Sequence, residues 1–168
     1  SYAFQEPMRG PGGGSSGLAE ALDAAYHLTT GKTVAFGMAD TIMTPVDVFQ
    51  RLYPVASEAD VVLGLFATDT PEKFGMVDFD QAGVVRQIVD KPEQTDLRYM
   101  WGCILWRPVF TEWLHRNVAE EGAQDFATIM NKAIRKGMRF RGVPIEGGRY
   151  IDVGTYEEIA ALERKFHG

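Results

Sequence analysis

Apolar and polar positions change their period along this chain, which indicates alternating helices and strands. Apolar residues recur every three or four positions between Leu18 and Leu28, and short unbroken apolar runs cover residues 33–37 and 61–67. The first pattern predicts an amphipathic helix and the second predicts buried strands. The same reasoning predicts a strand remnant at 2–5, a helix over 44–53 with Pro45 in its first turn, a strand over 101–106, helices over 109–118, 126–136 (capped by Asp125) and 155–166, and a strand over 139–144. This order favours an α/β fold whose sheet is largely parallel with a mixed edge.

Residues 74–92 are the most informative segment, because they predict a β-hairpin that ends on two charged side chains. Two runs rich in β-branched and aromatic residues flank a glycine-containing loop at residues 80–83. Pro92 cannot continue a ladder, and it biases Lys91 toward an extended backbone. Neighbouring side chains on a strand face opposite sides, so Asp90 and Lys91 can serve one ligand only if the strand ends there.

Length and charge limit the possible function classes. The chain has 168 residues, of which 45% are hydrophobic, and this predicts a single domain over residues 1–168 with a flexible Gly/Ser-rich loop at 10–17. The net charge is -6 and no block of lysine and arginine is present, which argues against a nucleic-acid partner. Cys103 is the one cysteine, so an intramolecular disulfide and a cysteine-rich metal site are excluded. No signal peptide or membrane-length apolar run is visible in the sequence, and we expect a cytoplasmic protein without a membrane partner.

Acidic residues follow two of the predicted strands. Asp40 comes shortly after the strand at 33–37, and Asp152 precedes a glycine turn and a predicted helix. Ligands of open α/β sheets bind outside the carboxyl ends of the strands, and Mg²⁺ usually takes one or two carboxylates together with substrate phosphates. The alternative is that both aspartates are ordinary turn and cap residues.

The glycine-rich run could be mistaken for a nucleotide-binding motif. Residues 12–17 match Gly-x-Gly-x-x-Gly between a predicted strand and a predicted helix, with Asp40 after the next strand. A dinucleotide-binding turn must follow its strand directly, whereas residues 6–11 intervene here. A P-loop is excluded because Leu18 and Ala19 stand where Lys and Ser or Thr are required. The composition of the run is instead that of a linker.

Five short segments occur together in the order and spacing of one enzyme family. They are residues 37–42, 74–80, 89–92, 101–105 and 151–155. On these segments the chain resembles the later two-thirds of a sugar-phosphate nucleotidylyltransferase, or nucleotide-sugar pyrophosphorylase. This family includes glucose-1-phosphate thymidylyl- and uridylyltransferases and mannose-1-phosphate guanylyltransferases. The resemblance implies a Rossmann-like, mixed and mostly parallel sheet flanked by helices, truncated at its N-terminus.

The resemblance also implies roles for particular residues. Asp40 and Asp152 match the two aspartates that bind Mg²⁺ in the family, and Lys91 matches the lysine that contacts the sugar 1-phosphate. Asp90 stands where the family usually has a glutamate that holds sugar hydroxyls. Because the aspartate side chain is shorter, the resemblance does not indicate which sugar is bound.

Four further positions match residues that surround the substrates. Gly75 matches the glycine whose backbone approaches the sugar, and Gly102 lies in the strand that packs beneath it. Gln5 and Gly17 resemble the glutamine and glycine that read the nucleotide base. The alternatives are that Gln5 is exposed to solvent, that Gly17 only begins a helix, and that Lys91 is an ordinary surface residue.

The implied activity transfers a nucleotidyl group from a nucleoside triphosphate to a sugar 1-phosphate, with release of pyrophosphate. Such a reaction requires alignment of the substrates and neutralisation of their charge, and it needs no protein nucleophile. His27, His115 and His167 are therefore given no role. The family's opening strand and its Gly-x-Gly-Thr-Arg-Leu donor loop have no match here. A non-catalytic module that binds a sugar phosphate or a nucleotide sugar, or an inactive fragment, is therefore the alternative function. Unpaired edges of a truncated sheet predict a homo-oligomer.

Overall fold

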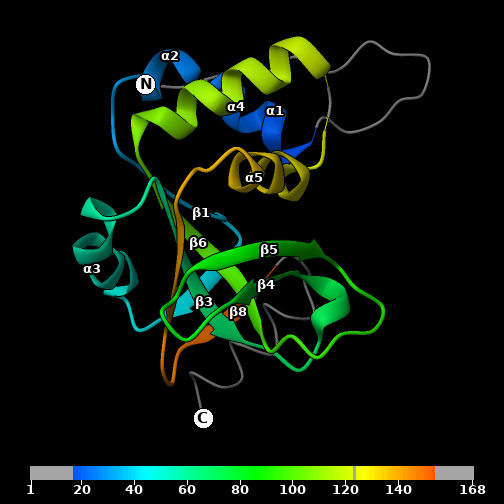
Figure 1. Ribbon diagram of the computed structural model, residues 1–168. Helices are drawn as coiled ribbons and strands as arrows, with labels where there is room; N and C mark the ends of the chain where they lie inside the picture. The colour runs from blue at the N-terminus through cyan, green and yellow to red at the C-terminus, as the bar shows by residue number, and fades with distance from the viewer. Residues whose placement is uncertain (1–16, 123, 154–168) are drawn as a thin grey trace.

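A computed structural model describes residues 17–122 and 124–153, and its centre is a mixed β-sheet. The strands are β1 (Val34–Gly37), β3 (Val61–Ala67), β4 (Gly75–Phe79), β5 (Val85–Asp90), β6 (Tyr99–Trp106) and β7 (Phe140–Pro144). They lie in the order β5-β4-β6-β3-β7, and β1 also pairs with β6. The sheet is thus built around the long strand β6 (Figure 1).

Strand direction reflects this central position of β6. It runs antiparallel to β1, β3 and β4, whereas β3 and β7 form a parallel pair. Since β1 and β3 both run opposite to β6, the strands β1, β3 and β7 all have the same direction. β6 lies between β1 and β3 and separates these two strands. The predicted hairpin is confirmed by the antiparallel pairing of β4 with β5.

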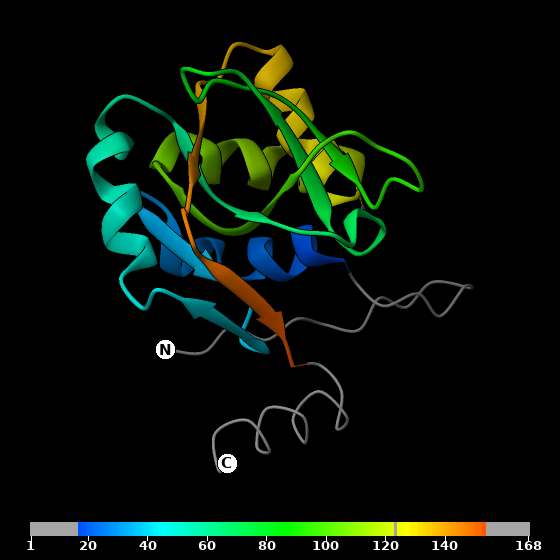
Figure 2. The same cartoon turned by 90° about the horizontal axis from the view of Figure 1, so that it is seen from below.

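Helices cover both faces of the sheet (Figures 1 and 2). On one face lie α1 (Leu18–Ala24), α2 (Tyr26–Thr29), α4 (Pro108–Glu121) and α5 (Phe126–Arg135); near the other lie α3 (Val48–Leu52) and a 3₁₀ helix (Tyr53–Ser57). A hydrophobic cluster fills each interface, one with Leu63 and Phe110 and the other with Leu52 and Phe66. Six successive residues of β3 are therefore buried, as expected for a strand covered on both faces.

Two predicted elements around residues 33–53 differ in the structure. β1 is only half-buried and exposes Ala35, because it lies at an edge of the described sheet. The predicted helix over 44–53 begins only at Val48, and residues 41–44 form the strand β2 (Thr41–Thr44) instead. Thr44 precedes Pro45 and is thereby biased toward an extended backbone, which suits the end of a strand.

β2 pairs with β8 (Arg149–Asp152) in a separate two-stranded sheet, visible in Figure 2 as the two arrows nearest the C-terminal end of the chain. This pairing joins two segments that are more than a hundred residues apart in the sequence. The predicted strand at 2–5 and the predicted helix at 155–166 lie outside the described residues, as does all of the Gly/Ser-rich run except Gly17. A short 3₁₀ turn (Pro71–Lys73) precedes β4. No described helix is long and apolar enough to cross a membrane.

Candidate functional site

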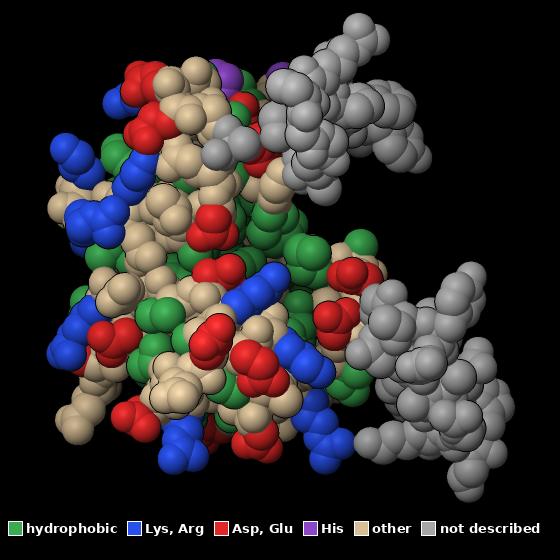
Figure 3. Space-filling model, turned by 90° about the vertical axis from the view of Figure 1, so that its right-hand side faces the viewer, with side chains coloured by type: hydrophobic (Ala, Val, Ile, Leu, Met, Phe, Trp, Pro, Cys, Tyr) green, Lys and Arg blue, Asp and Glu red, His purple; other side chains and the backbone are tan. Residues whose placement is uncertain are grey.

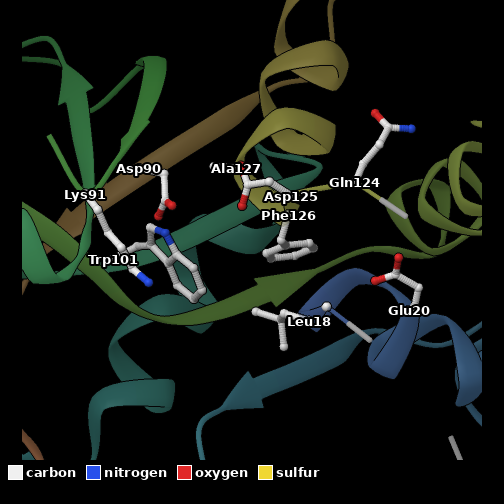
Figure 4. A pocket seen from close by; sticks show the side chains of 10 residues that line it. Leu18, Glu20, Asp90, Lys91, Trp101, Gln124, Asp125, Phe126 and Ala127 are labelled. Atoms are coloured by element: carbon white, nitrogen blue, oxygen red, sulfur yellow. The ribbon is translucent and has the colours of Figure 1, made fainter. Parts of the chain in front are cut away.

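A cavity of about 380 Å³ opens between the helices and the end of the β4–β5 hairpin (Figure 4). This volume falls in the range of small-molecule sites. Its lining comes from α1, α5, β6 and the end of β5: Gly17, Leu18, Glu20, Asp90, Lys91, Trp101, Gln124, Asp125, Phe126 and Ala127. Three residues singled out by the sequence, Gly17, Asp90 and Lys91, therefore lie at one cavity.

The end of the hairpin has an unusual backbone. Lys91 has a φ of 42°, not the extended value predicted from the following Pro92. Its amide still donates a hydrogen bond to the carbonyl of Phe74 (3.0 Å), so the last ladder bond is kept while the chain turns. The change of direction ends the strand after Asp90, and both charged side chains line the cavity. A non-glycine residue with positive φ is strained, and such strain concentrates at functional sites.

Two carboxylates face this end of the cavity. Partial burial and the neighbouring carboxylate of Asp125 raise the pKa of Asp90, and the ammonium of Lys91 offsets only part of this effect. Asp125 also accepts a hydrogen bond from the amide of Thr128 (3.1 Å), which confirms it as the N-cap of α5. The cavity therefore holds two acceptor groups and one cation close together, a combination suited to a ligand with hydroxyls and a phosphate.

Gly75 and Trp101 form the wall behind these charges. Gly75 lies opposite Asp90 in the β4–β5 ladder, and a Cβ at this glycine would collide with Nε1 of Trp101. The indole Nε1 is buried and has no hydrogen-bond partner in the described part of the chain. The indole packs edge-on against Phe126, with ring centroids 6.0 Å apart. Gly75 thus acts by making room for the indole rather than by lining the cavity itself.

The far end of the cavity is formed by the start of α1 and the segment before α5. Gly17 is the N-cap of α1, and its carbonyl accepts a hydrogen bond from the amide of Ala21 (3.1 Å). Both carboxylate oxygens of Glu20 are buried, and neither has a partner among the residues described. Gln124 accepts a hydrogen bond from Nζ of Lys132 (2.7 Å) through its Oε1.

Asp40 and Asp152 are brought together outside this cavity, where β2 meets β8. Thr41 pairs with Asp152, and the amide of Val153 donates to the carbonyl of Asp40 (2.8 Å). Burial raises the pKa of Tyr150, and the charges of Asp152 and Asp40 raise it further, while a hydrogen bond with Thr41 lowers it. Both carboxylates therefore act on one phenol.

Asp40 and Asp152 are the two residues at this place that could hold a divalent ion together with a ligand. Within residues 17–122 and 124–153, no group of three or more His, Cys, Asp or Glu side chains could hold a metal ion alone. Mg²⁺ does not need such a group, since it commonly takes one or two carboxylates and completes its shell with water and substrate phosphates.

Tyr150 connects the acidic pair to the hairpin. Its ring packs edge-on against Phe74, at a centroid distance of 5.8 Å, and the carbonyl of Phe74 is the acceptor for Lys91. Gly102 lies beneath Tyr150: a Cβ there would stand 2.6 Å from its Cδ2 and 2.8 Å from the ring of Phe66. Gly102 is thus a packing position for Tyr150 and does not line the cavity.

The sequence-predicted residues therefore fall into two connected groups. Gly17, Asp90 and Lys91 line the cavity, with Gly75 behind it. Asp40 and Asp152 meet at β2 and β8, and Gly102 lies beneath Tyr150 of β8. Gln5 lies outside the described residues. Sequence reasoning gave no binding role to Glu20, Trp101, Gln124, Asp125 and Phe126, and only the position of Glu20 just after Gly17 could have drawn attention to it.

On the face shown in Figure 3, acidic and basic side chains are interspersed.

Comparison with known proteins gives a family match and several similar folds. A family model described as nucleotidyl transferase matches residues 1–167. An apo UDP-glucose pyrophosphorylase is 18% identical with a TM-score of 0.76, over 99% of this chain and 63% of that one. A UTP-bound UGPase from Acinetobacter baumannii is 13% identical with a TM-score of 0.73, over 89% and 56%. HddC from Yersinia pseudotuberculosis is 16% identical with a TM-score of 0.67, over 91% and 64%.

These likenesses confirm the predicted Rossmann-like mixed sheet flanked by helices. The prediction that the sheet is mostly parallel is wrong for the described residues: only β3 and β7 pair in parallel, because β6 and the β4–β5 hairpin add antiparallel pairings. The chain spans less than two thirds of each of these structures. Comparison with curated protein sequences finds no match.

Proposed function

The chain belongs to the nucleotidyl transferase family, and on this premise we propose that it transfers a nucleotidyl group from a nucleoside triphosphate to a sugar 1-phosphate. One observation carries the proposal: Asp90 and Lys91 line one cavity, and Tyr150 and Phe74 link that cavity to the carboxylates of Asp40 and Asp152. A sugar phosphate needs hydroxyl acceptors beside a cation, and a triphosphate needs a site for a divalent ion.

The reaction needs no protein nucleophile. An oxygen of the sugar 1-phosphate attacks the α-phosphorus of the triphosphate; one P–O bond forms, the bond to the leaving phosphates breaks, and pyrophosphate departs with the bonding electrons. Lys91 holds the attacking phosphate through its ammonium, while Asp90 and Asp125 accept hydrogen bonds from sugar hydroxyls. Asp40 and Asp152 would hold Mg²⁺, which supplies charge neutralisation to the phosphate oxygens.

A second candidate function is binding without catalysis. The match covers nearly all of this chain but only 63% of the UDP-glucose pyrophosphorylase, so the activity of the whole enzyme does not transfer by similarity. The cavity is enough for a module that binds a sugar phosphate or a nucleotide sugar. Both functions require ligand at Lys91, and only the first requires turnover.

Isotope exchange between labelled pyrophosphate and a nucleotide sugar distinguishes them. We expect Mg²⁺-dependent exchange with this chain and at least a 100-fold loss in the Asp40→Asn variant, in line with roughly 3 kcal/mol for a lost electrostatic contact in a transition state. Asp47→Asn is the matched control, because Asp47 pairs with Arg51 at the surface (3.2 Å). Equal exchange in the Asp40 variant and the parent would contradict the catalytic proposal. Nucleotide-sugar binding without any exchange would support the second candidate.

A further inference from the structure

The carboxylate of Glu20, in the first turn of α1, is buried without a hydrogen-bond partner in the described part of the chain. Both of its oxygens are shielded from solvent, and the described residues offer no hydrogen bond to either one. Burying a carboxylate without partners is costly, and the cost is recovered when a ligand donates to both oxygens. Glu20 is one of the residues that line the cavity, so its side chain lies next to any ligand that enters there.

The position of this carboxylate is fixed by Gly17. A Cβ at residue 17 would stand 2.9 Å from Oε2 of Glu20 and 3.9 Å from the carbonyl oxygen of Gln124. The carboxylate therefore rests against the bare backbone at the start of α1, close to the segment that leads into α5. A side chain at position 17 would push it out of this place.

The two ends of the cavity are suited to different groups of a ligand. Asp90 and Lys91 lie at one end and Glu20 at the other, with the side chains of Leu18, Trp101 and Phe126 between them (Figure 4). An anionic group suits the ammonium, a flat apolar body suits the aromatic and aliphatic walls, and a pair of donors suits the carboxylate. A nucleotide has these groups: its phosphate is the anion, the face of its base is the flat body, and the edge of the base carries the donors.

The donor pattern of the base decides which nucleotide fits. Guanine presents two adjacent N–H groups, N1–H and N2–H, on one edge, and these match the two in-plane oxygens of a carboxylate. Adenine and cytosine each present one amino group beside a ring acceptor. Uracil and thymine present one N–H between two carbonyl oxygens, which a carboxylate repels. We propose that Glu20 reads the base of the bound nucleotide and that this base is guanine. The inference rests on the proposed function, since it specifies the substrate class of the same site.

Calorimetric titration with GDP, dGDP, UDP and ADP in the presence of Mg²⁺ tests the proposal. One two-donor contact discriminates between bases by about 1–3 kcal/mol, so we expect GDP to bind roughly 5- to 150-fold more tightly than UDP. Glu20→Gln should remove most of this preference by weakening GDP. Glu58→Gln is the matched control at an exposed glutamate and should leave the preference unchanged.

A second variant covers the case in which Glu20→Gln does not fold. Gly17→Ala keeps the carboxylate but displaces it, and the φ of −72° at Gly17 suits alanine. It should also reduce the ratio of GDP to UDP affinity.

The remaining outcomes separate this inference from the proposed function. Similar affinities for GDP, UDP and ADP would overturn guanine recognition and leave the proposed function standing. A large loss with dGDP that disappears in Glu20→Gln would assign the carboxylate to the ribose hydroxyl and overturn base reading. Failure of all four nucleotides to bind would count against the proposed function as well.

Discussion

Replacing Gly102 with alanine tests whether Tyr150 is held in place by the sheet beneath it. The added Cβ would lie 2.6 Å from Cδ2 of Tyr150 and 2.8 Å from two ring atoms of Phe66. Carbon atoms prefer a separation of about 3.5–4.0 Å, so one or both rings must move by roughly 1 Å. Phe66 is fully buried, and the two rings already pack at a centroid distance of 5.7 Å. Overpacking of this kind costs about 1–3 kcal/mol.

Thermal unfolding measures this cost. For a chain of this size, 1 kcal/mol corresponds to about 2–4 °C, so Gly102→Ala should lower the Tm by roughly 3–10 °C. It should also weaken Mn²⁺ binding, because Tyr150 lies beside the carboxylates of Asp40 and Asp152. Gly37→Ala is the control, since its Cβ would meet mainly the flexible end of Met43 at 3.2 Å. An unchanged Tm in Gly102→Ala would refute the packing argument.

Three other substitutions and one solution property give further tests. Gly75→Ala should displace the indole of Trp101 and weaken nucleotide binding, seen as a red shift of tryptophan emission and a higher Kd; unchanged emission would contradict this. Burial raises the pKa of Asp60, but hydrogen bonds and charge from Arg139 outweigh it and hold the pKa low. Asp60→Asn should therefore lower the free energy of unfolding by about 1–2 kcal/mol at pH 7, measured by chemical denaturation. The difference between variant and parent should vanish as the pH falls through the lowered pKa. A difference that does not depend on pH would show that the charge of Asp60 is not its cause. The pKa of Asp90 is raised, so its charged form destabilises the fold above that pKa. Asp90→Asn should raise the Tm at pH 7 and have no effect at low pH. A lower Tm of the variant at pH 7 would contradict the expectation that the charged form of Asp90 destabilises the fold. Self-association stays a prediction, which light scattering tests; a monomer at high concentration would contradict it.

Elements with strong local signals could be predicted from the sequence. The run from Val61 to Ala67, the hairpin around Gly83 and the Asp125 cap each depend on neighbours in the chain, and each is found in the structure. The strand β2 was missed because its partner β8 lies more than a hundred residues away. Its last residue, Thr44, was assigned to the predicted helix over 44–53, and residues 41–43 were assigned to no element. The position of β6 between β1 and β3 is equally non-local.

The same limit applies to the candidate site. Asp90 and Lys91 were recognised as a pair, but the positive φ at Lys91 has no sequence signal in a non-glycine residue. Glu20 looks like any polar residue on an amphipathic helix until α5 and the cavity are placed beside it. Asp125 was identified correctly as a cap, whereas its approach to Asp90 depends on how α5 packs against β5. Local patterns therefore locate charged residues, and tertiary packing decides which of them meet.

Phosphorus NMR of a nucleotide sugar with Mn²⁺ tests most directly whether the acidic pair and the cavity act on one ligand. The account predicts that the chain with Mn²⁺ speeds the relaxation of both phosphorus signals of GDP-mannose or UDP-glucose, beyond the effect of Mn²⁺ alone. Asp152→Asn should abolish this enhancement by removing an ion ligand, and Lys91→Ala should abolish it by removing the phosphate contact. An enhancement that survives both substitutions, or no enhancement although the nucleotide sugar binds, would contradict the account.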